Sequence, residues 1–326
     1  MEIGSFIELE FQKGKEWYSE KNFPNLQIAR LNSGRAGIYH SFKVLNCKKI
    51  YIPYYQCDTV RDFLQKKGVE VDYYYLDEHF NPRVSSEEVG DDAILLVNYF
   101  GVMSNGRLKK LRELYKNVII DNSQAFFAKP LKDCLNVYSA RKFVGVPDGA
   151  YVIGKNVLNG YDEYKQGFSS DTALCMLSRH EYGLEGKTYQ ERQKNEARLD
   201  KEDVLKMSAL TRDILDGTNY KEIIKKRKHN FKKACSLFKD INKLDALEYY
   251  DRKTIPMVYP LVVEDDGLLN KLLTAKHFQG HWWTYLLEEM PKDSYEYWLS
   301  KFIIPITIDQ RYGELELEKL NEIIRN

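Results

Sequence analysis

The chain has 326 residues, of which 49 are basic and 48 acidic. That length is enough for two domains and a large core. The near balance of charge gives no support to a nucleic-acid or membrane partner held by bulk electrostatics. The sequence contains no run of about 18 apolar residues, the length that a transmembrane helix requires, so we expect no transmembrane helix. Residues 1–18 carry acidic side chains and lack the long apolar core of a signal peptide, so we expect a soluble, cytoplasmic protein.

Cysteine and histidine give no sign of a metal site. The five cysteines are odd in number, widely spaced and without a CxxC pair, a pattern typical of reduced cytosolic thiols. The six histidines show no metal-ligand spacing. We therefore predict that the protein binds no metal.

Helices and strands alternate from about residue 33 to residue 153. The apolar pattern predicts helices at 34–46, 57–67 and 106–115, and strands at 50–53, 70–75, 94–99 and 118–120. Such alternation predicts a mostly parallel sheet covered by helices.

The second half of the chain is less regular. Residues 156–215 combine weak apolar periodicity with many charges, which predicts a mobile or subunit-contacting stretch that leads into a helix. A helix with a solvated basic face is predicted at 219–239, and strands at 257–263 and 302–306 indicate a smaller α+β domain. We divide the chain into a large domain, 1–215, and a small domain, 216–326, and allow the first ~25 residues to pack with the small domain.

The most informative segment is 117–152. An apolar strand ends in Asp121, Gln124 follows, and a second strand runs into Ser139 and then Lys142. Open α/β sheets place ligands at the carboxyl ends of their strands. A lysine and a carboxylate at two such ends are what pyridoxal phosphate needs, because the amine forms the Schiff base and the carboxylate keeps the pyridine nitrogen protonated.

The plainer alternative is a carboxylate that caps a loop and a lysine in solvent. The neighbours of both residues favour the cofactor site. Asp121 directly ends an apolar strand, and Lys142 stands between the small pair 139–140 and the apolar pair 143–144. We therefore expect partial burial of Lys142, which favours the neutral amine that a Schiff base requires.

These residues also resemble a known family, the DegT/DnrJ/StrS-type sugar aminotransferases among the fold-type I pyridoxal phosphate enzymes. IIDNSQAF (119–126) and YSARKFVGVPDGAYVI (138–153) are similar to the family's carboxylate and lysine segments. Residues 31–42, 51–77 and 302–324 resemble three further family segments in the same order.

The resemblance implies a three-layer α/β/α large domain with a mostly parallel sheet and a smaller α+β C-terminal domain. It implies a pyridoxal phosphate-dependent aminotransferase that acts as a homodimer with shared active sites. Lys142 would hold the cofactor and transfer the proton, and Asp121 would bind the pyridinium. The implied reaction moves an amino group from glutamate to a keto group of a nucleotide-linked sugar, in surface polysaccharide or related biosynthesis.

The resemblance also assigns the remaining cofactor contacts. Backbone groups of Gly34, Arg35 and Ala36 would hold the phosphate at a helix N-terminus, although Ser33 and Gly34 also fit an ordinary helix cap. The Arg35 side chain, unusual for the family, would add charge to the phosphate or face the substrate. Ser139 would donate its hydroxyl to the same phosphate.

For the cofactor ring, Cys57 aligns with the family's stacking aromatic residue, and Tyr55 is the nearby substitute. Gln124 would bind the phenolic oxygen or cover the ring, unless it is an exposed loop amide. Arg311 could bind an anion, with a structural turn as the favoured interpretation. The aromatic segment 280–283 is interpreted as core packing more readily than as a substrate platform.

Two features bear on the reaction. The family's cross-subunit Asn and its neighbouring Arg align with Val204 and Lys206, so a cation from Lys206 would be the remaining contact of that kind. Lys142 stands where dehydratases of the family carry His, which favours transamination. The alternatives are a catalytically silent cofactor-binding or regulatory member, and a nucleotide-binding α/β protein, for which neither GxGxxG nor GxxxxGK[ST] is present.

Overall fold

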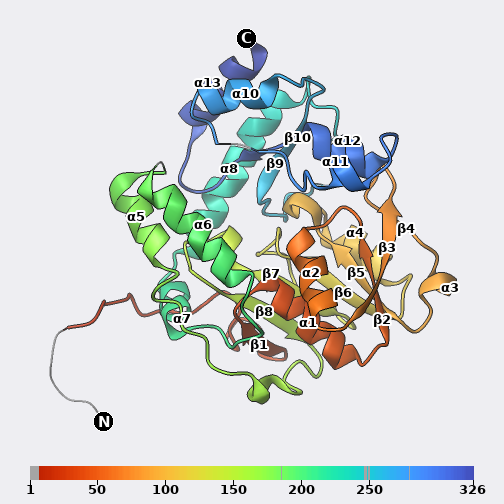
Figure 1. Ribbon diagram of the computed structural model, residues 1–326. Helices are drawn as coiled ribbons and strands as arrows, with labels where there is room; N and C mark the ends of the chain where they lie inside the picture. Colours follow the sequence, from red (N-terminus) through yellow and green to blue (C-terminus); the bar gives the residue numbers. More distant parts are fainter. Residues whose placement is uncertain (1–6, 185, 246–247, 249, 279) are drawn as a thin grey trace.

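The large sheet has five parallel strands at its centre. The computed structural model describes residues 7–326 except 185, 246–247, 249 and 279 (Figure 1). In this part of the chain the sheet has eight strands in the order β1-β8-β7-β6-β5-β2-β3-β4. Strands β7, β6, β5, β2 and β3 are parallel, and β1, β8 and β4 pair antiparallel. Their bounds are β1 Gln27–Leu31, β2 Lys49–Pro53, β3 Glu70–Leu76, β4 Pro82–Arg83, β5 Ala93–Val97, β6 Asn117–Asn122, β7 Leu135–Ser139 and β8 Ala150–Gly154. The predicted mostly parallel sheet is confirmed.

Helices cover both faces of this sheet, because side chains along a strand point to alternate faces. On β6, Ile119 packs in the cluster that includes α1 (Gly34–Leu45) and α2 (Asp58–Lys66). Its neighbour Ile120 packs in the opposite cluster with α4 (Asn105–Arg112). A short helix, α3 (Ser86–Val89), lies between β4 and β5. The predicted helices 34–46, 57–67 and 106–115 are confirmed to within about three residues.

Residues 174–216 form three helices, two more than the sequence predicted. They are α5 (Leu174–Tyr182), α6 (Lys187–Leu199) and α7 (Ala209–Asp216). Ion pairs hold α6 in place, among them Arg141–Glu196 at 2.8 Å. Because charged contacts rather than an apolar stripe hold α6, the apolar periodicity did not show this helix.

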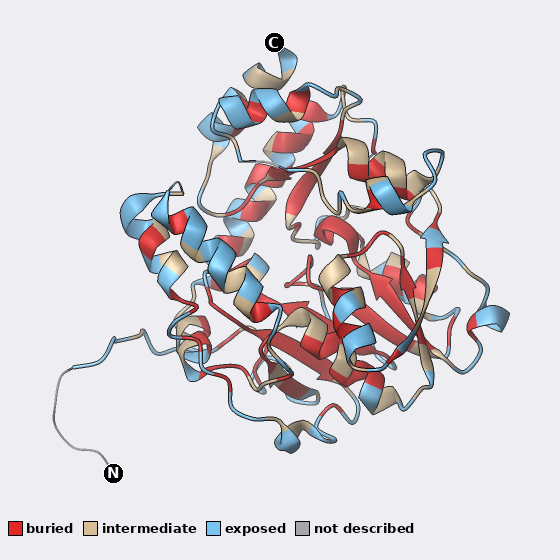
Figure 2. Ribbon diagram, in the orientation of Figure 1, coloured by how far each residue is buried: buried red, intermediate tan, exposed pale blue. Residues whose placement is uncertain are grey.

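The C-terminal part packs α8 (Tyr220–Phe238) and α13 (Glu314–Arg325) beside an antiparallel pair, β9 (Val258–Val262) and β10 (Ile303–Thr307). The described residues of this part also form three shorter helices, α10 (Leu268–Thr274), α11 (Leu286–Glu289) and α12 (Tyr295–Phe302). The predicted helix and both predicted strands are confirmed. One buried cluster joins this part to the large sheet, since Phe231 of α8 and Leu96 of β5 belong to it (Figure 2). Within the described residues, no helix has both the length and the apolarity that a membrane span requires.

The N-terminal segment contacts both parts of the molecule. Glu16 pairs with Arg30 of β1 at 2.6 Å, and Tyr18 is buried in a cluster with residues of β7 and β8. The ring of Trp17 lies 5.8 Å from that of Tyr220 in α8. The segment therefore packs on the large sheet as well as on the C-terminal part. The division of the chain at residue 215 stays a prediction.

Gly37 sets how closely α1 approaches the sheet. A Cβ at Gly37 would lie 2.8 Å from Cγ1 of Val137 and 3.2 Å from Cγ2 of Val152. Overpacking of this kind costs about 1–3 kcal/mol, so Gly37→Ala should lower the free energy of unfolding in urea by that amount. The control is Gly106→Ala in α4, where the nearest atom is 3.9 Å away. It should be neutral or stabilising by about 0.5–1 kcal/mol. A fully stable Gly37→Ala protein would contradict the close packing of α1.

Candidate active site

The structure brings Asp121 and Lys142 to the same edge of the sheet. Strands β6 and β7 are neighbours and parallel, with Asp121 opposite Val137. Lys142 ends η2 (Ala140–Lys142), the single 3-10 turn that follows β7 directly. Asp121 is 5% exposed. Both groups therefore stand at the carboxyl ends of adjacent strands, as the sequence predicted.

The expected partial burial of Lys142 is wrong. Its side chain is exposed, whereas the apolar neighbours Phe143 and Val144 are buried. The turn lies at the sheet edge, so these neighbours fill the core and leave the lysine outside. No hydrogen bond or ion pair of the Lys142 ammonium is recorded with any described residue, which leaves the amine accessible to a ligand.

Asp121 is held by two donors. The backbone N–H of Ser123 donates to Oδ1 at 2.8 Å, and Nε2 of Gln56 donates to Oδ2 at 3.2 Å. Each carboxylate oxygen can accept a second hydrogen bond, so Asp121 retains capacity for a ligand N–H. Gln56 also lines a cavity of about 200 Å³ together with Cys57 and Tyr285. Sequence reasoning missed Gln56, because an amide beside an aligned cysteine carries no distinctive signal.

The start of α1 at Gly34 forms a small cup together with Ser123 and Ser139. Ser33 caps the helix by accepting from the backbone N–H of Ala36 at 3.3 Å. A Cβ on Gly34 would lie 2.9 Å from Oγ of Ser123 and 3.9 Å from Cβ of Ser139. The predicted residues Gly34 and Ser139 are thus brought together, and Ser123 joins them unpredicted. Free N–H groups and the helix dipole favour an anion at such a helix start.

The Arg35 side chain lies against α6. Its Nη1 donates to Asp200 at 2.9 Å and its Nη2 to the backbone carbonyl of Leu199. The guanidinium is also 5.8 Å from the ring centre of Phe63. The Arg35 guanidinium is therefore bound at the C-terminus of α6, where the last carbonyls of the helix attract positive charge. The expectation that this side chain reaches the phosphate or the substrate is therefore not supported, and backbone binding at Arg35 stays a prediction.

Tyr55 is enclosed by protein. It is 0% exposed, and its ring centre lies 4.4 Å from Trp283 and 5.7 Å from Tyr99. Burial holds the pKa of Tyr55 well above its usual value. The ring offers no open face to a ligand, so stacking by Tyr55 is not supported. Trp283 serves core packing, as the sequence favoured.

Cys57 stands directly before α2, at its N-cap. Its thiol lies 3.1 Å from Oγ1 of Thr59, and no capping bond is made by the side chain. Its place opposite the cofactor ring stays a prediction.

Gln124 is buried rather than an exposed loop amide. Its Oε1 accepts from the backbone N–H of Phe100 at 2.5 Å. Gly101 also lies so close to the backbone of Gln124 that a Cβ would be 2.2 Å from the Gln124 carbonyl oxygen. The amide therefore fixes the turn η1 (Tyr99–Gly101), and a cofactor contact from its Nε2 stays a prediction.

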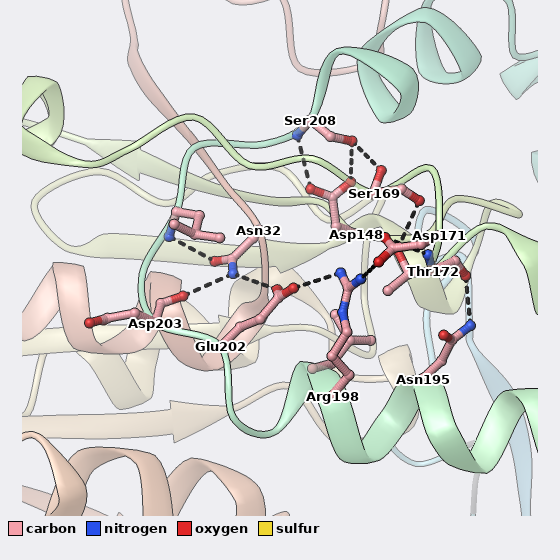
Figure 3. Close-up of polar contacts among 12 residues, drawn as sticks. Asn32, Asp148, Ser169, Asp171, Thr172, Asn195, Arg198, Glu202, Asp203 and Ser208 are labelled. Atoms are coloured by element: carbon pink, nitrogen blue, oxygen red, sulfur yellow. Dashed lines mark hydrogen bonds and ion pairs between the residues drawn. The ribbon is translucent and has the colours of Figure 1, made fainter.

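Buried polar contacts tie the loop after Lys142 to the segment before α7 and to the start of α1. Figure 3 shows two parts of this arrangement, the bonds of Asp148 to Ser208 and those of Asn32 to residues 202–205. Asp148 accepts from the backbone N–H and the hydroxyl of Ser208 at 2.9 and 2.7 Å. The N–H of Gly149 donates to the carbonyl of Asn32 at 2.8 Å, and the N–H of Asn32 donates to the carbonyl of Leu205 at 2.9 Å. The lysine loop, the cup and the segment before α7 are thus one connected unit.

Val204 and Lys206 lie within this segment. Val204 is buried in the cluster under α1. The Lys206 ammonium lies 3.4 Å from Asp162 of the same chain and 5.0 Å from the ring centre of Tyr161. A cation given by Lys206 to a second subunit is therefore not supported.

Arg311 takes part in a turn. Its Nε and Nη2 donate to the two carboxylate oxygens of Asp309 at 2.9 and 2.6 Å. This pairing favours the structural interpretation over an anion site.

Comparisons with known proteins show the fold. No family model and no curated protein matches the sequence. Many solved structures do match. One is a DegT/DnrJ/EryC1/StrS aminotransferase from Brucella abortus, with 13% identity, a TM-score of 0.60, and 92% of this chain and 85% of that chain covered. Another is NtdA from Bacillus subtilis with bound PMP, with 13% identity, a TM-score of 0.62, and coverages of 94% and 75%.

A third match is a dehydratase. It is a mutant GDP-4-keto-6-deoxymannose-3-dehydratase with bound GDP-perosamine, at 16% identity and a TM-score of 0.59, with 95% of this chain and 91% of that chain covered. One fold thus carries both transamination and dehydration among these proteins, so chemistry must be argued from the site. The chain has the fold of the DegT/DnrJ/EryC1/StrS-type aminotransferases.

Proposed function

We propose that the protein is a pyridoxal phosphate-dependent aminotransferase that acts on a keto group of a small molecule, specifically a nucleotide-linked sugar. The observation that carries the proposal is the pairing of a buried Asp121 and an exposed Lys142 at the ends of adjacent parallel strands. The shared fold supports it, since a structure of the same fold holds PMP.

The residues present fit the cofactor. Asp121 would hold a protonated pyridine nitrogen, because a buried carboxylate stabilises a nearby positive charge. The start of α1 with Gly34, Ser123 and Ser139 would hold the phosphate, since the missing Cβ of Gly34 leaves room there. The exposed ammonium of Lys142 makes no hydrogen bond or ion pair with a described residue, and it would bind the aldehyde carbon.

When bound, pyridoxal phosphate supplies an electron sink for the substrate carbon that loses its proton. Lys142 Nζ, the exposed amine at this edge of the sheet, would accept that proton and later return it. Gln56 would hold the Asp121 carboxylate in orientation through its 3.2 Å hydrogen bond.

The finer parts of the proposal rest on the family resemblance. They are glutamate as donor, a homodimer with shared active sites, a cytoplasmic location, and a role in surface polysaccharide or related biosynthesis. Exposed apolar side chains of α5, Leu174 and Leu177, support a subunit contact on that face.

A catalytically silent cofactor-binding protein is the second candidate. It is favoured by the enclosure of Tyr55, which leaves no open aromatic ring among the predicted cofactor residues. The two candidates differ in whether an amino donor changes the bound cofactor.

The absorption spectrum separates these candidates. Purified protein with pyridoxal phosphate should show a visible band that fades on addition of glutamate, because Lys142 binds the cofactor and then yields to the donor. Lys142→Ala should lack the band. Lys155→Ala, which removes an exposed lysine paired with Asp133, should keep it. A band that no amino donor alters would establish the silent protein, and a colourless wild type would refute both.

The cup at the start of α1 makes a second prediction. Gly34→Ala places a methyl group 2.9 Å from Oγ of Ser123. The crowding should weaken cofactor binding about 10-fold or more, the equivalent of about 1.4 kcal/mol. Titration of the apo protein with pyridoxal phosphate measures this change. Gly106→Ala is the matched control, and equal affinity of Gly34→Ala and wild type would place the phosphate elsewhere.

A further inference from the structure

The C-terminal part of the chain holds the backbone of the turn that carries Lys142. Nη2 of Arg227, in α8, donates to the carbonyl of Lys142 at 3.4 Å. Nε2 of Gln310, in the turn between β10 and α13, donates to the carbonyl of Phe143 at 2.8 Å. Two consecutive carbonyls of the lysine turn are therefore held by two side chains from a distant part of the sequence.

The two side chains act as a pair. Nε of Arg227 donates to Oε1 of Gln310 at 3.2 Å. That bond fixes the amide of Gln310, so that its Nε2 faces Phe143. The guanidinium also lies 4.4 Å from the ring centre of Phe143. Arg227 thus reaches the lysine turn directly and through Gln310.

Arg227 is an unusual residue to bury. It is 2% exposed, and its remaining bonds go to the carbonyls of Pro256 and Met257 at 3.3 and 2.9 Å. No ion pair of Arg227 is recorded with a described residue, and the nearby Asp309 is paired with Arg311. Burial lowers the pKa of Arg227 to about 10. A buried charge without a partner carboxylate is costly, so the contacts of this arginine call for an explanation beyond stability.

Other restraints act on the turn from the side of the sheet, where the N–H of Ala140 donates to the carbonyl of Gly149 at 3.0 Å and the side chains of Phe143 and Val144 are buried. Phe143 N–H donates to the carbonyl of Ala140 at 2.9 Å, and the Arg141 side chain pairs with Glu196 of α6. The Lys142 side chain is exposed. The backbone is therefore fixed from both sides, while the amine is left accessible, which is the arrangement that a positioned reactive group needs.

We propose that Arg227 and Gln310 are positioning residues for Lys142, which hold its backbone so that the amine meets the cofactor and the substrate carbon in a productive geometry. The inference rests on the proposed function of Lys142. It also makes the C-terminal part, through α8, a determinant of the rate of amine transfer.

The chain offers a matched control one turn further along α8. Asn230 is buried like Arg227, and its Nδ2 donates to the carbonyls of Ile308, Asp309 and Tyr312 at 3.1–3.2 Å. Asn230 therefore binds the turn in which Gln310 lies, but its side chain does not bind the lysine turn. In Asn230→Ala the bonds of Arg227 and Gln310 to the lysine turn remain, so this variant should leave Lys142 in place.

The test compares Gln310→Met, Arg227→Met and Asn230→Ala in two measurements on the full chain. In the apo protein, hydrogen exchange of the peptide that covers 140–146 should become about 10-fold faster in the first two variants, because local opening is easier. In the cofactor-loaded protein, the rate at which saturating glutamate removes the visible band should fall about 10- to 100-fold, the cost of a misplaced reacting group. The glutamate concentration for half-saturation should change less than about 2-fold. Asn230→Ala should alter neither measurement.

Gln310→Met is the decisive variant, because it changes no charge and keeps the side-chain length. If Arg227→Met does not fold, Gln310→Met alone carries the test. Wild-type exchange and rate in Gln310→Met would overturn the proposal, as would equal changes in Asn230→Ala. A wild type that takes up no pyridoxal phosphate would refute the proposed function, and the exchange measurement on the apo protein would still decide the positioning.

Discussion

The parallel pairing of β6 and β7 is the constraint on which the site depends. It places the carboxylate of Asp121 and the turn of Lys142 at one edge, because parallel neighbours end on the same side of a sheet. Gly37 then allows α1 to lie close over β7 and β8, so that the start of α1 reaches the same edge. The strand pairing and the close approach of α1 thus bring Asp121, the cup and the lysine turn to one edge of the sheet.

Much of this arrangement was predictable from the sequence. Apolar runs identified the central strands, and Ser33 with Gly34 marked the start of α1, because their signals are local. Helix α6 was not predicted, since ion pairs such as Arg141–Glu196 hold it and such pairs have no periodic pattern. The contacts of Gln56 and Ser123 were missed for a related reason, because they exist only after distant segments meet.

The errors at the site have a common cause. From the sequence, the environment of a residue is inferred from its neighbours in the chain, whereas tertiary packing decides which side chains are buried. Apolar neighbours suggested a partly buried Lys142, but they entered the core and left it exposed. For Gln124, an exposed loop amide was the alternative to a cofactor contact, and the approach of η1 excludes that alternative because it buries the side chain. Arg227 gave no signal at all, because it lies in a basic helix whose other cations are mostly in solvent.

The central claim is that Lys142, and no other lysine, carries the cofactor. Reduction of the pyridoxal phosphate-loaded protein with borohydride fixes the cofactor on the amine that holds it. Mass spectrometry of the peptides then identifies the modified residue. The account predicts one pyridoxyl group per chain, on the peptide that contains Lys142. Modification of a different lysine at full occupancy, or none at all, would contradict it.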